Sequence, residues 1–104
     1  MLIALCTCPD ADIGDRIART LVEERLAACV NRLPGVVSTY RWNGAIAVDE
    51  EVLLVIKTSK DRYPAMQARV VELHPYELPE VVAIEPGDGY APYLAWVDRE
   101  TRLG

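Results

Sequence analysis

The dipeptide Asn43-Gly44 constrains the fold of this 104-residue chain more than any other feature. A two-residue type I′ turn needs positive φ at both positions, and Asn followed by Gly is the strongest short-range signal for it. Strand-forming residues lie on both sides of the turn, alternating over 36–42 and nearly continuous over 45–59. The sequence therefore predicts a long antiparallel hairpin.

The length of this hairpin predicts that it extends beyond its own core. With a two-residue turn, Trp42 pairs with Ala45 and Tyr40 with Ala47, so large aromatic rings lie opposite small side chains. Fifteen strand residues extend roughly 50 Å, whereas a compact domain of this size has a radius of gyration of about 13 Å. Because an isolated two-stranded hairpin is only marginally stable in water, we expect another copy of the chain to cover it.

Other apolar runs predict the remaining strands. Residues 2–8 are almost continuously apolar, as in a strand that is covered on both faces. The strand before the turn should bend at Pro34, and the acidic residues 49–51 predict a bulge in the strand after it. The most hydrophobic stretch, 52–56, should be a central strand, and 81–84 a last core strand.

Three segments have helical patterns. Asp12 is the expected N-cap of an amphipathic helix over 13–22, which has one apolar stripe. A second helix should begin near Asp61 and end before Pro75, because the residue that precedes a proline disfavours the helical conformation. A terminal helix is expected over 91–101.

The order of elements is β-α-β, β-α-β and a final helix. Two such halves of similar length predict an α+β, ferredoxin-like split βαβ sandwich with an extended β-hairpin and a C-terminal helix. Right-handed crossovers place both main helices on one face of the antiparallel sheet. We expect a single domain over residues 1–104, since single domains of this length are common.

Charge and composition exclude several classes of protein. Sixteen acidic against eleven basic residues give a net charge of −5, whereas nucleic-acid binders need basic surfaces that neutralise phosphates. No apolar run approaches the roughly 20 residues of a membrane-spanning helix, and the N-terminus lacks the basic region of a signal peptide. Three cysteines, an odd number, argue against a disulfide framework. We therefore expect a cytoplasmic protein that binds neither nucleic acid nor membrane.

The sequence gives little support to an enzymatic function. Acylphosphatase-like chemistry on this fold needs a phosphate-binding loop with an Arg after the first strand, but the segment 7–12 is acidic. Nucleotide-binding and hydrolase motifs are absent from the sequence. The chain contains both cysteine and histidine, so a catalytic pair of a cysteine with His74 remains an open alternative. Each cysteine, however, lies in an apolar segment, where thiols are usually inert. We expect no catalytic residues.

Metal binding is the chemistry that these residues favour most. His74 provides the sole imidazole of the chain, and thiolates with imidazole suit copper or zinc. Cys6 and Cys8 should point to one face of their strand, while no spacing in the chain forms a ready-made chelate. The segment 74–80 is unusually rich in polar and proline residues, which indicates either a functional loop or a stiff connector. His74 itself has a structural alternative, as the end of a helix.

Several blocks of sequence resemble the CutA family, the divalent-cation tolerance proteins. The blocks occur in the order of the family between about Ile3 and Val97. They are 25–31 (RLAACVN), 40–44 (YRWNG), 56–58 (IKT), 74–80 (HPYELPE) and 93–96 (YLAW).

This resemblance implies a homotrimer similar in architecture to PII signalling proteins, with the hairpin exchanged between subunits. It implies copper or another divalent metal ion as the bound species, and no organic cofactor. The implied metal ligands are Cys6 and His74; a second His of some members is Leu73 here, and Cys29 matches a cysteine that we place in the core. The residues implied for the inter-subunit cleft are Tyr40, Trp42, Lys57, Glu77, Glu80 and Tyr93.

The sequence and the resemblance together predict a regulatory or protective protein without established catalysis. It should bind divalent or copper ions weakly and act in metal tolerance, with an unidentified protein partner as well as its own copies as binding partners. The alternative is a PII-like signalling module that binds a small molecule in the inter-subunit cleft. A third hypothesis is that the protein is a hydrolase, because one hydrolase has this fold.

Overall fold

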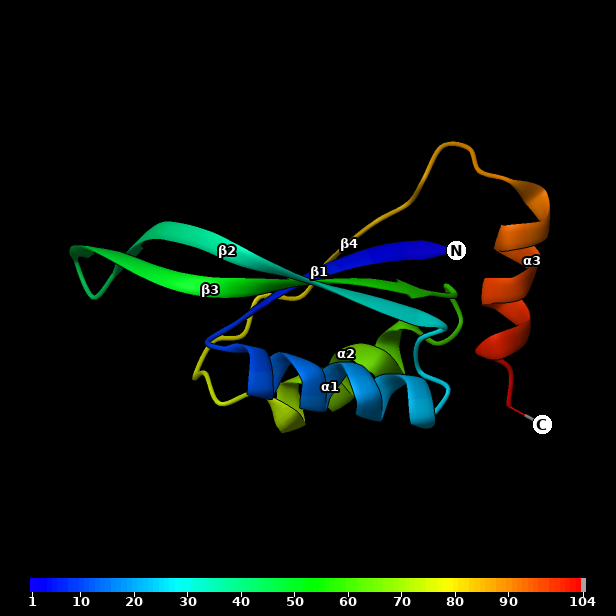
Figure 1. The fold of residues 1–104 in the computed structure, drawn as a ribbon, viewed down its shortest axis with the longest axis horizontal. Coiled ribbons are helices and arrows are strands. Elements are labelled where there is room, and N and C mark those ends of the chain that lie inside the picture. Colours follow the sequence, from blue (N-terminus) through cyan, green and yellow to red (C-terminus); the bar gives the residue numbers. More distant parts are fainter. Residues whose placement is uncertain (104) are drawn as a thin grey trace.

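The computed structural model describes residues 1–103 and contains four strands and three helices in that range (Figure 1). The chain begins with strand β1 and helix α1, continues through the hairpin of β2 and β3, and ends with α2, β4 and α3. Their bounds are β1 Leu2–Cys8, α1 Ala11–Glu23, β2 Cys29–Trp42, β3 Ala45–Thr58, α2 Tyr63–Leu73, β4 Val82–Ile84 and α3 Ala91–Glu100.

The strands form one antiparallel sheet in the order β2-β3-β1-β4, as expected for the ferredoxin-like topology. Helices α1 and α2 cover the same face of this sheet, and α3 lies at the end away from the hairpin turn (Figure 1). Alternate residues of β1 are fully buried in the layer between sheet and helices, together with Leu54 of β3, Ile17 of α1 and Met66 of α2. The central position of 52–56 is confirmed.

The hairpin has the predicted turn and register. Asn43 and Gly44 both have positive φ, at 50° and 79°, and Trp42 lies opposite Ala45. The distal part of β2 and β3 projects past the helices (Figure 1), which gives the molecule dimensions of 45 × 26 × 21 Å. The structure therefore confirms that the hairpin extends beyond the core of its own chain.

The bulge lies on β2, so its prediction at residues 49–51 of β3 was wrong. Pairing shifts between Leu33 and Val36, where Pro34 and Gly35 oppose one residue of β3. Proline has no N–H for the ladder, and Gly35 has a φ of 73° that a residue with a side chain adopts reluctantly. The expected bend at Pro34 is this bulge.

Two local expectations also need correction. Asp10, not Asp12, is the N-cap of α1, because its carboxylate accepts a hydrogen bond of 2.9 Å from the N–H of Ile13. Strand β4 is an edge strand rather than a core strand, since it pairs with β1 alone and its residues Val82 and Ile84 are exposed. The apolar residues of β4 therefore belong to an uncovered edge of the sheet and not to the core.

Candidate metal centre and adjacent cavity

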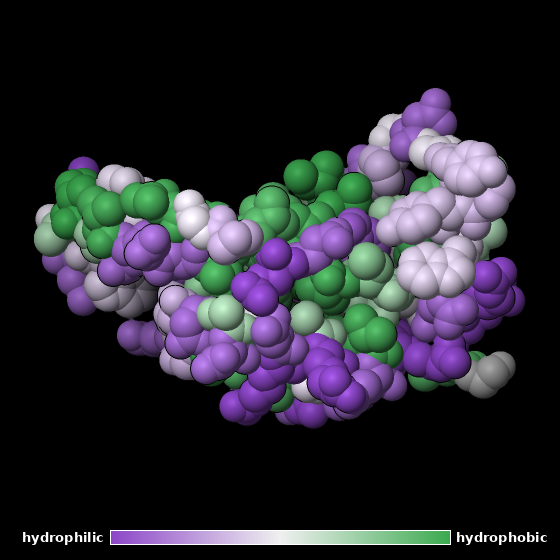
Figure 2. Space-filling model, viewed as in Figure 1, coloured by the Kyte–Doolittle hydropathy of each residue, from purple (hydrophilic) through white to green (hydrophobic). Residues whose placement is uncertain are grey.

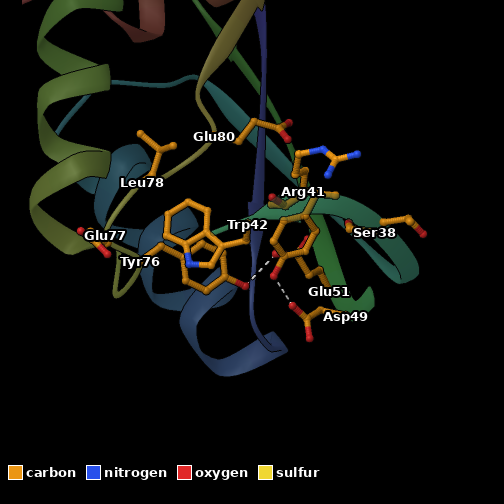
Figure 3. A pocket seen from close by; sticks show the side chains of 12 residues that line it. Ser38, Arg41, Trp42, Asp49, Glu51, Tyr76, Glu77, Leu78 and Glu80 are labelled. Carbon is orange, nitrogen blue, oxygen red and sulfur yellow. Dashed lines mark hydrogen bonds between the residues drawn. The ribbon is translucent and has the colours of Figure 1, made fainter. Parts of the chain in front are cut away.

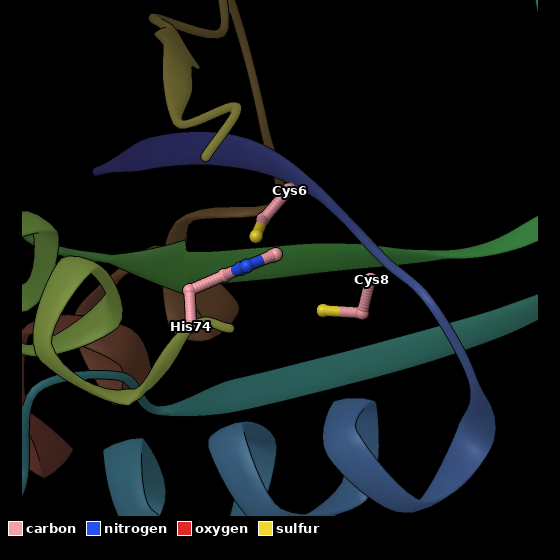
Figure 4. A group of neighbouring side chains, drawn as sticks. All are labelled: Cys6, Cys8 and His74. Atoms are coloured by element: carbon pink, nitrogen blue, oxygen red, sulfur yellow. The ribbon is translucent and has the colours of Figure 1, made fainter. Parts of the chain in front are cut away.

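Cys6, Cys8 and His74 form a buried cluster in which one potential ligand atom from each residue lies within 4.8 Å of the others. The period of two along β1 turns both thiols toward the helices, where they are fully buried. His74 follows the last residue of α2 and brings its imidazole beside them (Figure 4). The structure thus brings together the two predicted ligands, and Cys8 joins them.

Both ring nitrogens of His74 already have partners. Nδ1 accepts a hydrogen bond of 3.2 Å from the N–H of Tyr76, so the proton resides on Nε2, which donates to the carbonyl oxygen of Thr7 at 2.8 Å. The ring also lies 4.5 Å from that of Tyr76. These contacts hold the start of the segment after α2 against β1, and they describe a neutral imidazole.

The two thiols of the cluster influence each other's ionisation. The thiol of Cys6 donates a weak hydrogen bond of 3.7 Å to the carbonyl oxygen of Thr7, and interaction with Cys8 together with burial raises the pKa of Cys6 well above its usual range. Interaction with Cys6 lowers the pKa of Cys8, against burial, which raises it.

Cys29 lies apart from this cluster and is only partly buried, in contrast to the expected core position. It begins β2 opposite Lys57, whose ammonium lies 4.0 Å from the sulfur of Cys29 and contacts the side chain of Asn31. The pKa of Tyr93 is raised by burial and by the proximity of Cys29. Lys57 and Tyr93, two of the residues implied for a cleft, therefore gather around Cys29.

The other four residues implied for a cleft line a different feature, a cavity of about 650 Å³ between the hairpin and the segment after α2 (Figure 3). Within one chain the six residues consequently fall into two groups. The cavity is lined by Thr7, Ser38, Thr39, Tyr40, Arg41, Trp42, Asp49, Glu51, Tyr76, Glu77, Leu78 and Glu80.

Two tyrosines fix carboxylates at the wall of this cavity. Tyr76 donates a hydrogen bond of 2.6 Å to Glu51, and Tyr40 donates to Asp49 (Figure 3). Burial, followed by the bond to Glu51, raises the pKa of Tyr76, and the bond to Asp49 raises that of Tyr40. With Glu77 and Glu80 the wall is acidic and aromatic.

Cys8, Tyr76 and Glu51 are among the residues of these two sites that were not predicted as site residues. Cys8 had a usable signal, since its spacing from Cys6 on a strand already placed both thiols on one face. Tyr76 lies in the segment 74–80, which the sequence singled out, but its contact with Glu51 had no signal. This contact joins segments 25 residues apart, whose approach depends on the packing of α2 against the sheet.

The sheet order and the two helices on one face define a ferredoxin-like α+β protein, to which the thiols and the imidazole add a candidate metal centre. Residues 2–100 match the family model described as CutA1 divalent ion tolerance protein. The chain belongs to this family.

Relatives of known name agree with this assignment. The divalent-cation tolerance protein CutA of Thermus thermophilus is 46% identical over 99 residues, which are 95% of this chain and 96% of that protein. Protein CutA of Homo sapiens is 47% identical over 98 residues, 94% of this chain, but the chain spans only 55% of the human protein.

Solved structures show the same fold. The divalent cation tolerance protein of Thermus thermophilus superposes with a TM-score of 0.95 at 45% identity, over 98% of this chain and 100% of that one. The PII-like protein CutA from Nostoc, in apo form, has a TM-score of 0.92 at 44% identity, with both chains covered completely. Within the described residues, no helix combines the length and the apolar character needed to cross a membrane.

Proposed function

We propose that this protein binds divalent or copper ions at Cys6 and His74 and acts in metal tolerance as a cytoplasmic homotrimer without catalysis. The observation that carries the proposal is the buried cluster of two thiols and one imidazole within 4.8 Å. Thiolate and imidazole are ligands for copper and zinc. The names of the relatives, which describe divalent-cation tolerance, support the same role.

The donor set fits such an ion with one local change. A metal ion that binds Nε2 of His74 takes the place of the proton that now bonds the carbonyl of Thr7. The bond from the N–H of Tyr76 to Nδ1 is kept, and it orients the ring as hydrogen bonds at the remote nitrogen of metal-binding histidines commonly do. The free-energy cost of losing the hydrogen bond to Thr7 should keep the affinity for divalent ions modest.

The trimer is proposed from the uncovered hairpin. Val37, Ile46 and Val48 lie on one face of its distal part and are 66%, 62% and 61% exposed. Apolar residues gather over this end of the molecule (Figure 2). Several large apolar side chains exposed together on one strand pair are typical of an interface, and the free edge of β4 offers unpaired backbone groups to another strand.

Calorimetric titration of the reduced protein with Zn(II) and Cu(II) tests the proposed site. The unchanged protein should bind a stoichiometric amount of ion, and Cys6→Ser and His74→Gln should each abolish saturable binding. Cys29→Ser is the matched control, because it removes a thiol outside the cluster. Unchanged binding in both Cys6→Ser and His74→Gln, with melting curves that show folded variants, would refute the site.

The cavity of about 650 Å³ favours a second function, a PII-like module that binds a small molecule. A volume of this size suits a small organic ligand, and a structural neighbour is described as PII-like. Trp42→Ala should abolish such binding and leave metal uptake unchanged, whereas Cys6→Ser should have the opposite effect. A thermal-shift screen of small molecules, run with the unchanged protein and with these two variants, distinguishes the two functions. The same screen with Lys57→Ala tests whether the group around Cys29 contributes to the binding of a small molecule.

A further inference from the structure

Cys8 has no role in the function proposed above, although it is one of the two thiols of the cluster. Cys8 pairs with Val52 of β3, and Cys6 pairs with Leu54. Because the two cysteines share a face of β1, they present their sulfurs to the same apolar layer. Figure 4 shows both sulfurs on the helix side of β1. Both side chains are fully buried and neither forms a disulfide.

We infer that Cys6 and Cys8 together bind a soft monovalent ion, Cu(I), as a two-coordinate dithiolate. This inference rests on the proposed metal function and assigns to it a particular ion and ligand pair. The two sulfurs lie within 4.8 Å of one another, and two metal–sulfur bonds of about 2.3 Å each span roughly 4.6 Å, so one ion can join them after a local adjustment of the two side chains. The two thiol protons pass to solvent on binding.

The engagement of His74 favours this ion over a divalent one. Zn(II) in a structural site takes four ligands, whereas the cluster offers three donors, and the imidazole is bonded through both nitrogens to Tyr76 and Thr7. Cu(I) is stable with two thiolates, which are soft ligands that select it. It can therefore bind without breaking either bond of His74.

The surroundings of the two sulfurs support the same choice. The buried core cluster around Cys6 and Cys8 consists of aliphatic residues and methionine, whose side chains exclude water and offer no oxygen ligand to a hard cation. The carbonyl oxygen of Thr7, 3.7 Å from the sulfur of Cys6, is already bonded to His74. The Cu(I) dithiolate has one net negative charge, and a ring nitrogen of His74 lies within 4.8 Å of the sulfurs. His74 is in this account a neighbour of the complex and not a ligand.

Anaerobic titration of the reduced protein with Cu(I), in competition with a chromogenic Cu(I) chelator, tests this inference. Cys6→Ser and Cys8→Ser should each weaken binding more than about 100-fold, beyond the 10- to 100-fold loss typical of residues that merely support a ligand. Cys29→Ser and His74→Gln should change it less than about tenfold. X-ray absorption of the bound ion should show sulfur neighbours only. Cys8→Ala provides a second variant if Cys8→Ser does not fold.

The outcomes separate this inference from the proposed function. If Cys8→Ser and Cys8→Ala both bind Cu(I) as tightly as the unchanged protein, or if a nitrogen neighbour is found, the dithiolate is refuted. Loss of Zn(II) binding in Cys6→Ser and His74→Gln would then still support the divalent site. If the folded protein takes up neither ion in stoichiometric amount, both proposals fail and the thiols are core residues only.

Discussion

The phenol of Tyr76 donates a hydrogen bond of 2.6 Å to the carboxylate of Glu51 and so joins the segment after α2 to the middle of β3. Glu51 is only 8% exposed. Tyr76 also donates its backbone N–H to His74, which in turn bonds Thr7 of β1. One residue therefore connects the wall of the cavity with the candidate metal centre.

Tyr76→Phe should lower the free energy of unfolding by about 1–3 kcal/mol, because a buried carboxylate loses its donor. Urea unfolding at neutral pH and one fixed protomer concentration measures the effect, since the stability of an oligomer depends on concentration. Glu51→Gln is the matched control, because an amide oxygen still accepts from the phenol, and its effect should be smaller. An equal or greater loss in Glu51→Gln would contradict this role of the hydrogen bond.

The raised pKa of Tyr76 predicts a loss of stability at alkaline pH. Burial and the bond to Glu51 favour the neutral phenol in the folded state, so its folded pKa exceeds the unfolded value of 10.0. The stabilisation is complete below pH 10 and decreases as the pH rises toward the folded pKa. The ultraviolet absorbance of tyrosinate should show a late-ionising group that Tyr76→Phe removes. Simultaneous ionisation of all tyrosines near pH 10 would contradict this.

The reassigned N-cap of α1 makes a paired prediction. Asp10→Ala removes the acceptor for the N–H of Ile13 and should lower the free energy of unfolding by about 0.5–2 kcal/mol. Asp12→Ala should have a smaller effect, because Asp12 lies within the first turn and contributes only through the helix dipole. Thermal unfolding of the two variants compares them, and a larger effect of Asp12→Ala would refute the assignment.

Burial predicts how the three thiols react. Cys6 and Cys8 are fully buried, so they should react with a thiol reagent at the rate of local or global opening. Cys29 is partly buried and should account for any fast phase, which Cys29→Ser should remove. Bound Cu(I) should slow the remaining phase further. Fast reaction of more than one thiol in the native protein would contradict the buried cluster.

Trp42→Arg should weaken the proposed trimer or cause aggregation, because it places a charge on the aromatic side of the hairpin. Sedimentation velocity at several concentrations measures the shift toward monomer. Gln67→Arg adds the same charge on the exposed surface of α2 and should leave the assembly unchanged. A Trp42→Arg protein that remains a trimer of undiminished stability would show that the aromatic side of the hairpin is not part of the interface.

Local patterns were sufficient to predict much of the fold. Asn43-Gly44 determined both the turn and the register, since a two-residue loop leaves a single pairing of Trp42 with Ala45. The period of two along β1 placed Cys6 and Cys8 on one face. The bulge was misplaced because two segments, one with Pro34 and one acidic, could each interrupt the ladder. Which of them does so depends on backbone groups that no side-chain pattern reveals.

Tertiary contacts explain what the sequence could not predict about the site. His74 and Thr7 are 67 residues apart, and their hydrogen bond follows from the way α2 ends over β1. The separation of Lys57 and Tyr93 from the cavity has the same origin, because both depend on where β2 begins and how α3 packs. The family resemblance identified these residues as candidates for a cleft but did not show how they group within one chain.

Native mass spectrometry of the reduced protein, before and after one equivalent of Cu(I) per chain, tests the account most directly. We predict one species of three times the 11.6 kDa chain mass, which takes up three ions and takes up none when Cys6 is replaced by Ser. A monomer, or a trimer that remains free of metal under these conditions, would contradict the account of a trimeric protein with a metal site in the core of each chain.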